Sequence, residues 1–246
     1  MTGSFGKIAV GVPYYKGVPE FWLSWTMMLV QGQFQPGDRV LNTLGPDGRP
    51  NIEMGVRLPL AHNKIIREFL LTDCDTLCII EDDHGFRADQ LNRMRFKPAN
   101  QEFDIVCADY VNRRVDARMQ PCGWWMPETV ESRGGYMAGI WLNRYERTGT
   151  QAVDGAAFGF SLHRRWVLEA MCGDNDPEEF MWADCVRGCS PDMPFYYQAH
   201  DVGATVGVDR DNGVIHVGSY RYSVADGWAW LDEQLERLGQ EQNTEG

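Results

Sequence analysis

The sequence has no excess of basic residues and no large basic patch. Aspartate and glutamate total 35 against 23 lysines and arginines, which gives a formal net charge of -12 at pH 7. A surface that binds nucleic acid usually needs clustered Lys and Arg. The basic clusters here are short, as at Arg113-Arg114 and Arg164-Arg165. We therefore expect no stable binding to nucleic acid.

Paired cysteine motifs and long apolar runs are also missing. None of the 7 cysteines forms the C-x-x-C pair of a zinc site, although Cys185 and Cys189 could share one face of a helix. We expect free buried thiols, which indicate a reducing compartment. No apolar stretch is long enough to span a bilayer, and no charged leader precedes an apolar run. The expectation is a cytoplasmic protein, complete at its start and without a membrane anchor, of a bacterial or virus-encoded kind.

The first half of the chain alternates strand and helix patterns. Short apolar runs predict strands at 7–13, 39–44, 76–80 and 103–107. Apolar residues at helical spacing predict helices at 19–33 and 57–71. This rhythm is typical of an α/β domain whose mostly parallel central sheet is covered by helices on both faces.

The second half is less regular. Residues 108–150 are rich in Arg, Gly, Pro and aromatics, and we interpret them as a long insertion or a set of short antiparallel strands. An ordered block begins at 153–160. It leads to expected helices at 163–171, 193–200 and 224–238 and to strands at 205–209 and 213–217.

These patterns fit a single domain over residues 1–238. It comprises a first half at 7–107, a second half at 108–218, a C-terminal helix at 223–238 and a disordered tail at 239–246.

Three consecutive carboxylates, Glu81-Asp82-Asp83, follow the predicted strand at 76–80. Ligands of open parallel sheets bind beyond the carboxyl ends of the strands. Adjacent carboxylates repel one another unless a cation or a proton intervenes. Mg²⁺ and Mn²⁺ accept oxygen ligands and bridge carboxylates to phosphates. The cluster predicts a metal–diphosphate site, and the alternative is a solvated acidic turn.

The segment around this cluster, CDTLCIIEDDHGFRADQL, resembles the strand, D-x-D motif and following helix of GT-A glycosyltransferases, especially the family-2-like soluble enzymes of phages and bacteria. Glu81 takes the place of the first acidic residue and Asp83 that of the second. KIAVGVPYY is similar to the opening strand and nucleotide-cradling loop of that family. LPLAHNKIIREFLLTDCD resembles the helix before the D-x-D strand, with His62-Asn63 where Arg-Asn is usual.

Two further segments extend the resemblance into the second half. AVDGAAFGFSLHRRWVLEAM resembles the strand and helix near the acceptor and donor sugar, and Gly159 takes the position of the second glycine of that motif. The family also has an acidic residue, a Phe, a Gly and a His at characteristic intervals. This chain has the same intervals between Asp192, Phe195, Gly203 and His216. Pro191 stands where a second acidic residue is usual, and Asp184 is the substitute if the register differs.

The resemblance implies a single GT-A domain with a nucleotide-binding half at 7–107 and an acceptor half at 108–218. Such a domain transfers one sugar from a UDP- or GDP-linked donor with Mn²⁺ or Mg²⁺. Metal binding is assigned to Asp83, with Glu81 and His216. Asp192 would be the general base of an inverting reaction, although it could instead cap a helix. His216 could equally be a solvated residue at a strand end.

Donor and acceptor contacts complete the assignment. Donor binding is assigned to Pro13, Tyr14, Tyr15, Asn63, Glu81 and Asp82. Acceptor binding is assigned to Trp124, Trp125 and Gly159. For the aromatic residues, ordinary packing is the alternative. The acceptor could be a glycan, a protein, a lipid carrier or a modified nucleobase, and a retaining reaction stays open.

Two other functions fit parts of the pattern. A metal-dependent nucleotidyltransferase would carry a Gly-rich loop with a basic residue after the first strand, whereas VPYYKGVPE has Lys16 but few glycines. A non-catalytic sugar-binding protein would have little reason to carry Asp83, Asp192 and His216 together.

Overall fold

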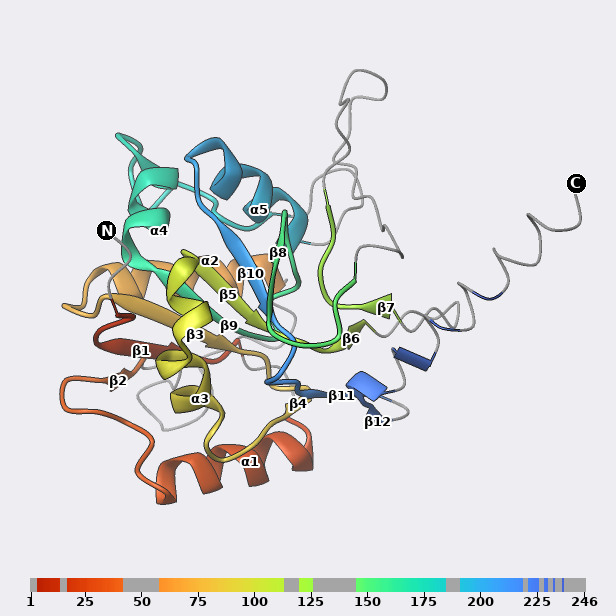
Figure 1. Ribbon diagram of the computed structural model, residues 1–246. Coiled ribbons are helices and arrows are strands. Elements are labelled where there is room, and N and C mark those ends of the chain that lie inside the picture. The colour runs from red at the N-terminus through yellow and green to blue at the C-terminus, as the bar shows by residue number, and fades with distance from the viewer. Residues whose placement is uncertain are drawn as a thin grey trace, which may run out of the picture.

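The computed structural model describes residues 4–13, 17–41, 58–112, 120–125, 145–184, 191–218, 221–225, 228–229, 232 and 236. These residues form a mixed α/β domain in which helices flank a central sheet (Figure 1). Within the described segments, no helix is both long and apolar enough to cross a membrane.

The central sheet has seven strands. In spatial order they are β2 (Arg39–Val40), β1 (Ile8–Gly11), β3 (Thr76–Ile80), β9 (Phe160–Arg164), β5 (Ile105–Ala108), β10 (Val206–Asp209) and β8 (Thr150–Val153). Five strands share one direction, while β9 and β8 run antiparallel to their neighbours. Strands β1, β3, β5 and β10 are buried along their whole length. Because helices cover both faces of the sheet, the sequences of these strands are almost continuously apolar.

Three helices form one layer against the sheet. Helix α4 (Arg165–Cys172) contacts both α2 (Leu58–Leu70) and α5 (Asp192–Asp201). Helix α3 (Gln90–Phe96) and the 3₁₀ turn η1 (Pro98–Glu102) follow β3, and Figure 1 shows α3 in front of the sheet. Helix α1 (Pro19–Val30) lies at the lower edge of that view.

Two small antiparallel sheets complete the architecture. One consists of β12 (Arg221–Tyr222), β11 (Ile215–Val217) and β4 (His84–Gly85), and α1 packs against β4. The other pairs β6 (Val111–Asn112) with β7 (Gln120–Pro121). This pairing lies inside the irregular stretch at 108–150, where short antiparallel strands were one of the two expectations.

The α/β fold class and the mostly parallel sheet are confirmed, but the predicted helix at 163–171 begins too early. His163 belongs to β9, and α4 starts at Arg165. Ser161 and His163 are fully buried and bond to each other, with Oγ 2.7 Å from Nε2. Their mutual hydrogen bond lets polar residues occupy a buried strand, which concealed the strand pattern.

Several expectations fall wholly or partly outside the described residues. These are the end of the strand at 39–44, most of the helix at 224–238 and the tail at 239–246. The division into a half at 7–107 and a half at 108–218 stays a prediction. The central sheet draws strands from both halves, because β9 lies between β3 and β5.

A buried ion pair joins β10 to the end of β5. The Nη1 atom of Arg210 lies 2.7 Å from Oδ1 of Asp109 and also donates to the Cys122 carbonyl at 2.7 Å. The Nη2 atom donates to Gln151 at 2.8 Å. Burial raises the pKa of Asp109 to about 6, although the charge of Arg210 opposes that rise. The pair therefore holds the segment that leads from β5 toward β6.

We predict that Arg210→Met destabilises the fold by about 3–5 kcal/mol, because it leaves a buried carboxylate without its cation. Without Arg210 the folded-state pKa of Asp109 should rise further above its unfolded value. Stability would then be lost as pH rises through that raised pKa, so the defect should be larger at pH 8 than at pH 5. Urea unfolding at both pH values measures this. A double variant with Asp109→Asn should recover part of the loss, and a double variant no more stable than Arg210→Met would contradict this account.

Candidate metal centre

Two histidines lie side by side on adjacent strands of the small sheet formed by β4, β11 and β12. In the antiparallel pairing of β4 with β11, His84 lies directly opposite His216. Their rings stack, with centroids 4.5 Å apart and planes 12° from parallel. Directly opposed side chains on one face of an antiparallel pair are close neighbours. Register thus brings together two residues 132 positions apart in the sequence.

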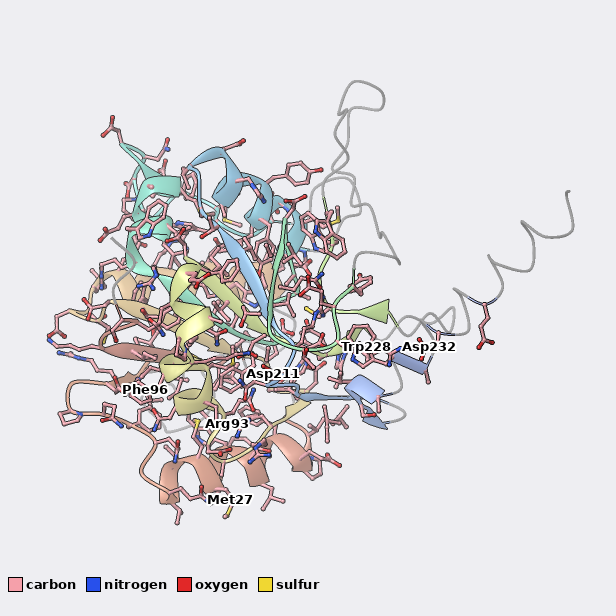
Figure 2. The ribbon with its side chains drawn as sticks, viewed as in Figure 1. Met27, Arg93, Phe96, Asp211, Trp228 and Asp232 are labelled. Atoms are coloured by element: carbon pink, nitrogen blue, oxygen red, sulfur yellow. The ribbon has the colours of Figure 1, made fainter. Side chains whose placement is uncertain are left out.

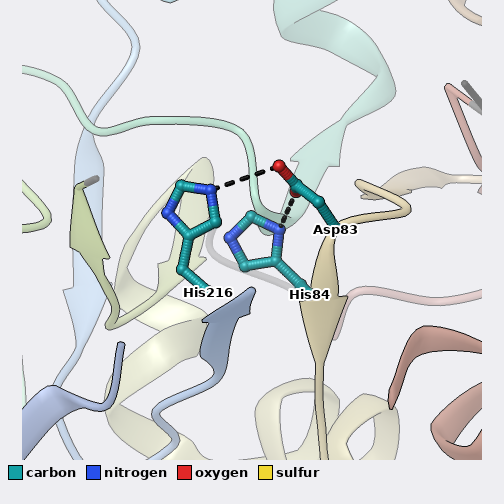
Figure 3. Close-up of side chains that lie close together, drawn as sticks. All are labelled: Asp83, His84 and His216. Atoms are coloured by element: carbon teal, nitrogen blue, oxygen red, sulfur yellow. Dashed lines mark hydrogen bonds and ion pairs between the residues drawn. The ribbon is translucent and has the colours of Figure 1, made fainter. Parts of the chain in front are cut away.

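The carboxylate of Asp83 lies beside both imidazoles (Figure 3). Its Oδ1 atom is 2.8 Å from Nδ1 of His84, and its Oδ2 atom is 3.2 Å from Nε2 of His216. The Asp83 carbonyl accepts a hydrogen bond from the Val217 amide at 2.8 Å. Backbone pairing therefore fixes the carboxylate next to the two rings.

The hydrogen bond made by Nδ1 of His216 determines whether Nε2 faces Asp83 with a proton or with a lone pair. Nδ1 lies 3.0 Å from the Val111 carbonyl oxygen, which can only accept, so Nδ1 carries a proton. In the neutral ring, Nε2 then presents a lone pair toward a carboxylate oxygen. That arrangement is favourable when a proton or a metal cation lies between the two atoms.

The three side chains have the composition and spacing of a divalent-metal site. Their ligand atoms all lie within 4.8 Å of one another. Adjacent ligands of an octahedral ion bound at about 2.1 Å lie about 3 Å apart. The distances of 2.8 and 3.2 Å fit that spacing. Two imidazoles and one carboxylate suit Mn²⁺ and related transition metals better than Mg²⁺, which prefers oxygen ligands.

The surroundings favour the ionised form of Asp83. Burial acts to raise the pKa of the carboxyl, but the hydrogen bonds and charges of His216 and His84 outweigh it and hold the pKa well below its usual range. A divalent cation held by the three side chains would take the place of that imidazolium charge beside the ionised carboxylate.

Tyr110 supports both imidazoles from one side. Its ring meets the His84 ring edge-on at 4.6 Å and the His216 ring at 5.6 Å. The Tyr110 ring in turn needs Gly159, because a Cβ atom there would lie 2.4 Å from the tyrosine ring. Gly159 also accepts a hydrogen bond from the Glu81 amide at 2.7 Å. Gly159 thus lies next to the candidate centre, and its predicted contact with an acceptor stays a prediction.

The other two members of the acidic triplet have different surroundings. Oε1 of Glu81 is 3.6 Å from Nε2 of the buried His62. Asp82 is largely buried and accepts a hydrogen bond from the Gly17 amide at 2.6 Å, and its carbonyl accepts one from Val18 at 3.0 Å. Asp82 therefore joins the loop before α1 to the end of β3. Metal binding by Glu81 and donor binding by Glu81 and Asp82 stay predictions.

The remaining predicted donor residues are Pro13, Tyr14, Tyr15 and Asn63. Asn63 is fully buried, and its amide group both donates to and accepts from the backbone of Ala183, at 2.6 and 3.1 Å. This pairing ties α2 to the segment before α5. Pro13 is buried just beyond β1, whereas Tyr14 and Tyr15 lie outside the described residues. Donor contacts by these residues stay predictions.

The two tryptophans assigned to the acceptor are more than nine-tenths buried. The Trp124 ring stacks on Tyr197, with centroids 6.2 Å apart, and the Trp125 ring meets Tyr145 edge-on at 5.1 Å. This environment agrees with the alternative that both tryptophans are ordinary packing residues. A role for Trp124 or Trp125 in acceptor binding stays a prediction.

Asp192, the predicted base, is the first residue of α5, with Pro191 at the N-cap position. The negative charges of Glu81 and Asp192 both contribute to the raised pKa of Tyr110, after the larger effect of burial. Asp192 and Glu81 therefore lie within electrostatic range of the tyrosine that supports the two imidazoles. A helix N-terminus also favours a negative side chain. Catalysis by Asp192 stays a prediction.

His84 was absent from the residues assigned on the sequence. Its position directly after Asp83 was the available signal, because histidine is a frequent metal ligand. Nothing in the sequence indicated that β4 would pair with β11. Of the three metal ligands proposed from the sequence, Glu81, Asp83 and His216, the structure groups Asp83 and His216 with the imidazole of His84.

The chain is similar to known proteins in structure but not in sequence. No family profile and no curated protein matches the sequence. Among solved structures, the crystal structure of A197 from STIV aligns with a TM-score of 0.53 at 14% identity and covers 86% of each chain. GalNAc-T7 with UDP, GalNAc and Mn²⁺ aligns over 88% of this chain and 44% of its own, at 11% identity. Its TM-score is 0.46.

Likeness at 14% identity shows the fold alone. The seven-stranded, mostly parallel sheet, its flanking helices and the two small antiparallel sheets are consistent with a single GT-A-like domain. The candidate metal centre lies at the carboxyl end of β3, where such sheets hold their ligands.

We predict that the wild-type protein binds Mn²⁺ and that His84→Ala and His216→Ala each weaken this binding by at least tenfold. Each change removes one imidazole ligand from the same ion. Isothermal titration with MnCl₂ at pH 7.5 measures the affinities. His200→Ala is the matched control, because His200 bonds to the Asp154 carbonyl at 2.9 Å and is not part of the cluster. Equal affinities for all three variants would refute the centre.

Proposed function

We propose that this protein is a metal-dependent glycosyltransferase that transfers one sugar from a UDP- or GDP-linked donor to an acceptor hydroxyl. One observation carries the proposal: Asp83, His84 and His216 converge at the carboxyl end of β3 in a GT-A-like α/β domain. In such a domain this edge of the sheet is where a nucleoside diphosphate and its cation would bind.

The proposed cofactor is Mn²⁺, held by Asp83, His84 and His216. When bound, the ion would neutralise the negative charge that develops on the departing nucleoside diphosphate. Asp83 supplies one formal negative charge, so the ion keeps most of its positive charge for phosphate oxygens. Mg²⁺ is the weaker candidate because two of the three ligands are imidazoles.

The residues around the centre would position the substrate groups. Asp82 anchors the loop before α1, which adjoins the predicted nucleotide-cradling loop. We propose that Glu81, whose carboxylate lies 3.6 Å from Nε2 of His62, contacts the donor. Asp192, the first residue of α5, would take the proton of the acceptor hydroxyl. That role implies inversion at the sugar carbon.

A panel of nucleotide sugars tests the donor class directly. UDP- and GDP-linked sugars are incubated with the protein, with and without Mn²⁺, and the release of UDP or GDP is measured together with thermal shift. A ligand at about 100 times its dissociation constant should add about 2.7 kcal/mol of stability. Pyrophosphate released from nucleoside triphosphates would instead support the nucleotidyltransferase alternative. Binding without turnover, across a panel of acceptors, would support a non-catalytic sugar-binding protein.

Asp83→Asn should abolish Mn²⁺-dependent binding of the nucleotide. The substitution keeps the shape of the side chain but removes the anionic ligand, so the diphosphate loses its counter-charge. Calorimetry with UDP and GDP in the presence of Mn²⁺ should show at least a tenfold loss of affinity. Asp89→Asn is the control, since Asp89 pairs with Arg87 on the surface. If the wild type binds a nucleotide and Asp83→Asn binds it equally well, the metal assignment is wrong.

Asp192→Asn should leave donor binding nearly intact and lower turnover by a factor of about 10² to 10⁴, the usual contribution of a positioned base. The matched control is Asp201→Asn at the other end of α5. Steady-state rates are compared with nucleotide affinities for both variants. A full transfer rate in Asp192→Asn would exclude the base role and turn attention to Asp184 or to a retaining reaction. Loss of nucleotide binding would move Asp192 to the donor site.

A further inference from the structure

Helix α1 presents an exposed apolar face to solvent. Leu23, Met27 and Val30 recur at positions i, i+4 and i+7 and so share one side of the helix. Figure 2 labels Met27 on the outward side of α1. The large apolar side chains of this outer face are exposed as follows: Trp22 43%, Leu23 67%, Met27 40%, Leu29 45% and Val30 76%. Contiguous apolar patches of several hundred Å² on a protein surface mark interaction sites.

The opposite side of α1 is firmly attached to the domain. Phe21, Ser24 and Met28 are buried, and the Ser24 hydroxyl accepts a hydrogen bond from the Phe86 amide at 3.0 Å. The amide of Val18, the residue before the helix, donates to the Asp82 carbonyl at 3.0 Å. The outer face is therefore a rigid surface, and little conformational entropy would be lost when a partner binds to it.

The charge distribution identifies the kind of partner. Residues 21–37 contain no Asp, Glu, Lys or Arg, although the whole chain has a net charge of -12. Two copies of so acidic a protein repel each other across most surfaces, and contact through an uncharged face minimises that repulsion. A helix that lies on an anionic membrane would need Lys or Arg beside its apolar face, and this stretch has neither.

We propose that the outer face of α1 is a homodimer interface, in which α1 packs antiparallel against α1 of a second copy across a two-fold axis. A two-fold contact uses the same patch on both copies, as a single apolar stripe requires. If each of the five side chains exposes on the order of 100 Å², two copies would bury about 1,000 Å², the lower limit for a specific interface. This inference is independent of the proposed glycosyltransferase activity.

Sedimentation velocity over a range of concentrations tests the proposal. The wild type should shift from monomer to dimer, and Leu23→Glu/Met27→Glu should stay monomeric at concentrations where the wild type is fully dimeric. Leu71→Glu is the matched control, because Leu71 follows α2 and is 86% exposed. Equal secondary structure by circular dichroism establishes that the double variant is folded. A wild type that stays monomeric at 100 times its lowest tested concentration, or a dimer that survives both substitutions, overturns the proposal.

Disulfide cross-linking tests the antiparallel geometry of the proposed dimer separately. Thr26 is exposed midway between Trp22 and Val30, so it should lie near the two-fold axis of an antiparallel pair. Thr26→Cys should form a disulfide-linked dimer under mild oxidation, whereas Leu71→Cys should not. Co-sedimentation is measured in parallel with vesicles of phosphatidylcholine and of phosphatidylglycerol. A monomer that binds either vesicle through α1, and loses this binding in Leu23→Glu/Met27→Glu, would replace the dimer with a membrane surface.

Discussion

The candidate site depends on one strand register, the pairing of His84 with His216 between β4 and β11. This pairing stacks the two imidazoles and places the Asp83 carboxylate beside both of them. A slip of one residue would turn one imidazole to the other face of the small sheet and separate it from the carboxylate. Register therefore has a direct chemical consequence here, because it determines whether three ligands converge.

The rest of the domain keeps that register in place. The Val217 amide bonds to the Asp83 carbonyl, and the Val111 carbonyl accepts from His216, so β11 is held from two sides. Tyr110 supports both rings and has room to do so because residue 159 is glycine. The buried pair of Arg210 with Asp109 holds the chain just before Tyr110. Packing far from the ligands thus contributes to their geometry.

Much of the fold follows from local sequence patterns. The strand at 76–80 was predicted with its observed bounds, because a run of five residues, four of them apolar, ends abruptly in carboxylates. Helix α2 also lies where the broad apolar side of 57–71 predicted it. Strand β9 was mistaken in part for helix, because Ser161 and His163 bond to each other inside the sheet and disguise a buried strand.

The candidate site was predicted less completely than the fold. Asp83 and His216 were assigned to the metal together with Glu81, and the side chains of Asp83 and His216 do lie together. His84 was missed because its importance arises from a partner strand 130 residues later, which no local pattern reveals. Burial of Asn63, Trp124 and Trp125 depends on tertiary packing in the same way. Residue type indicates what a side chain can do, whereas long-range pairing determines what it meets.

The central claim is that Asp83, His84 and His216 hold a divalent metal. The most direct measurement is anomalous X-ray diffraction from crystals soaked in MnCl₂, with data collected above and below the manganese absorption edge. The account predicts one strong anomalous peak within about 2.3 Å of a carboxylate oxygen of Asp83 and of a ring nitrogen of both histidines. A fully occupied Mn²⁺ elsewhere, with no density between these three side chains, would contradict it.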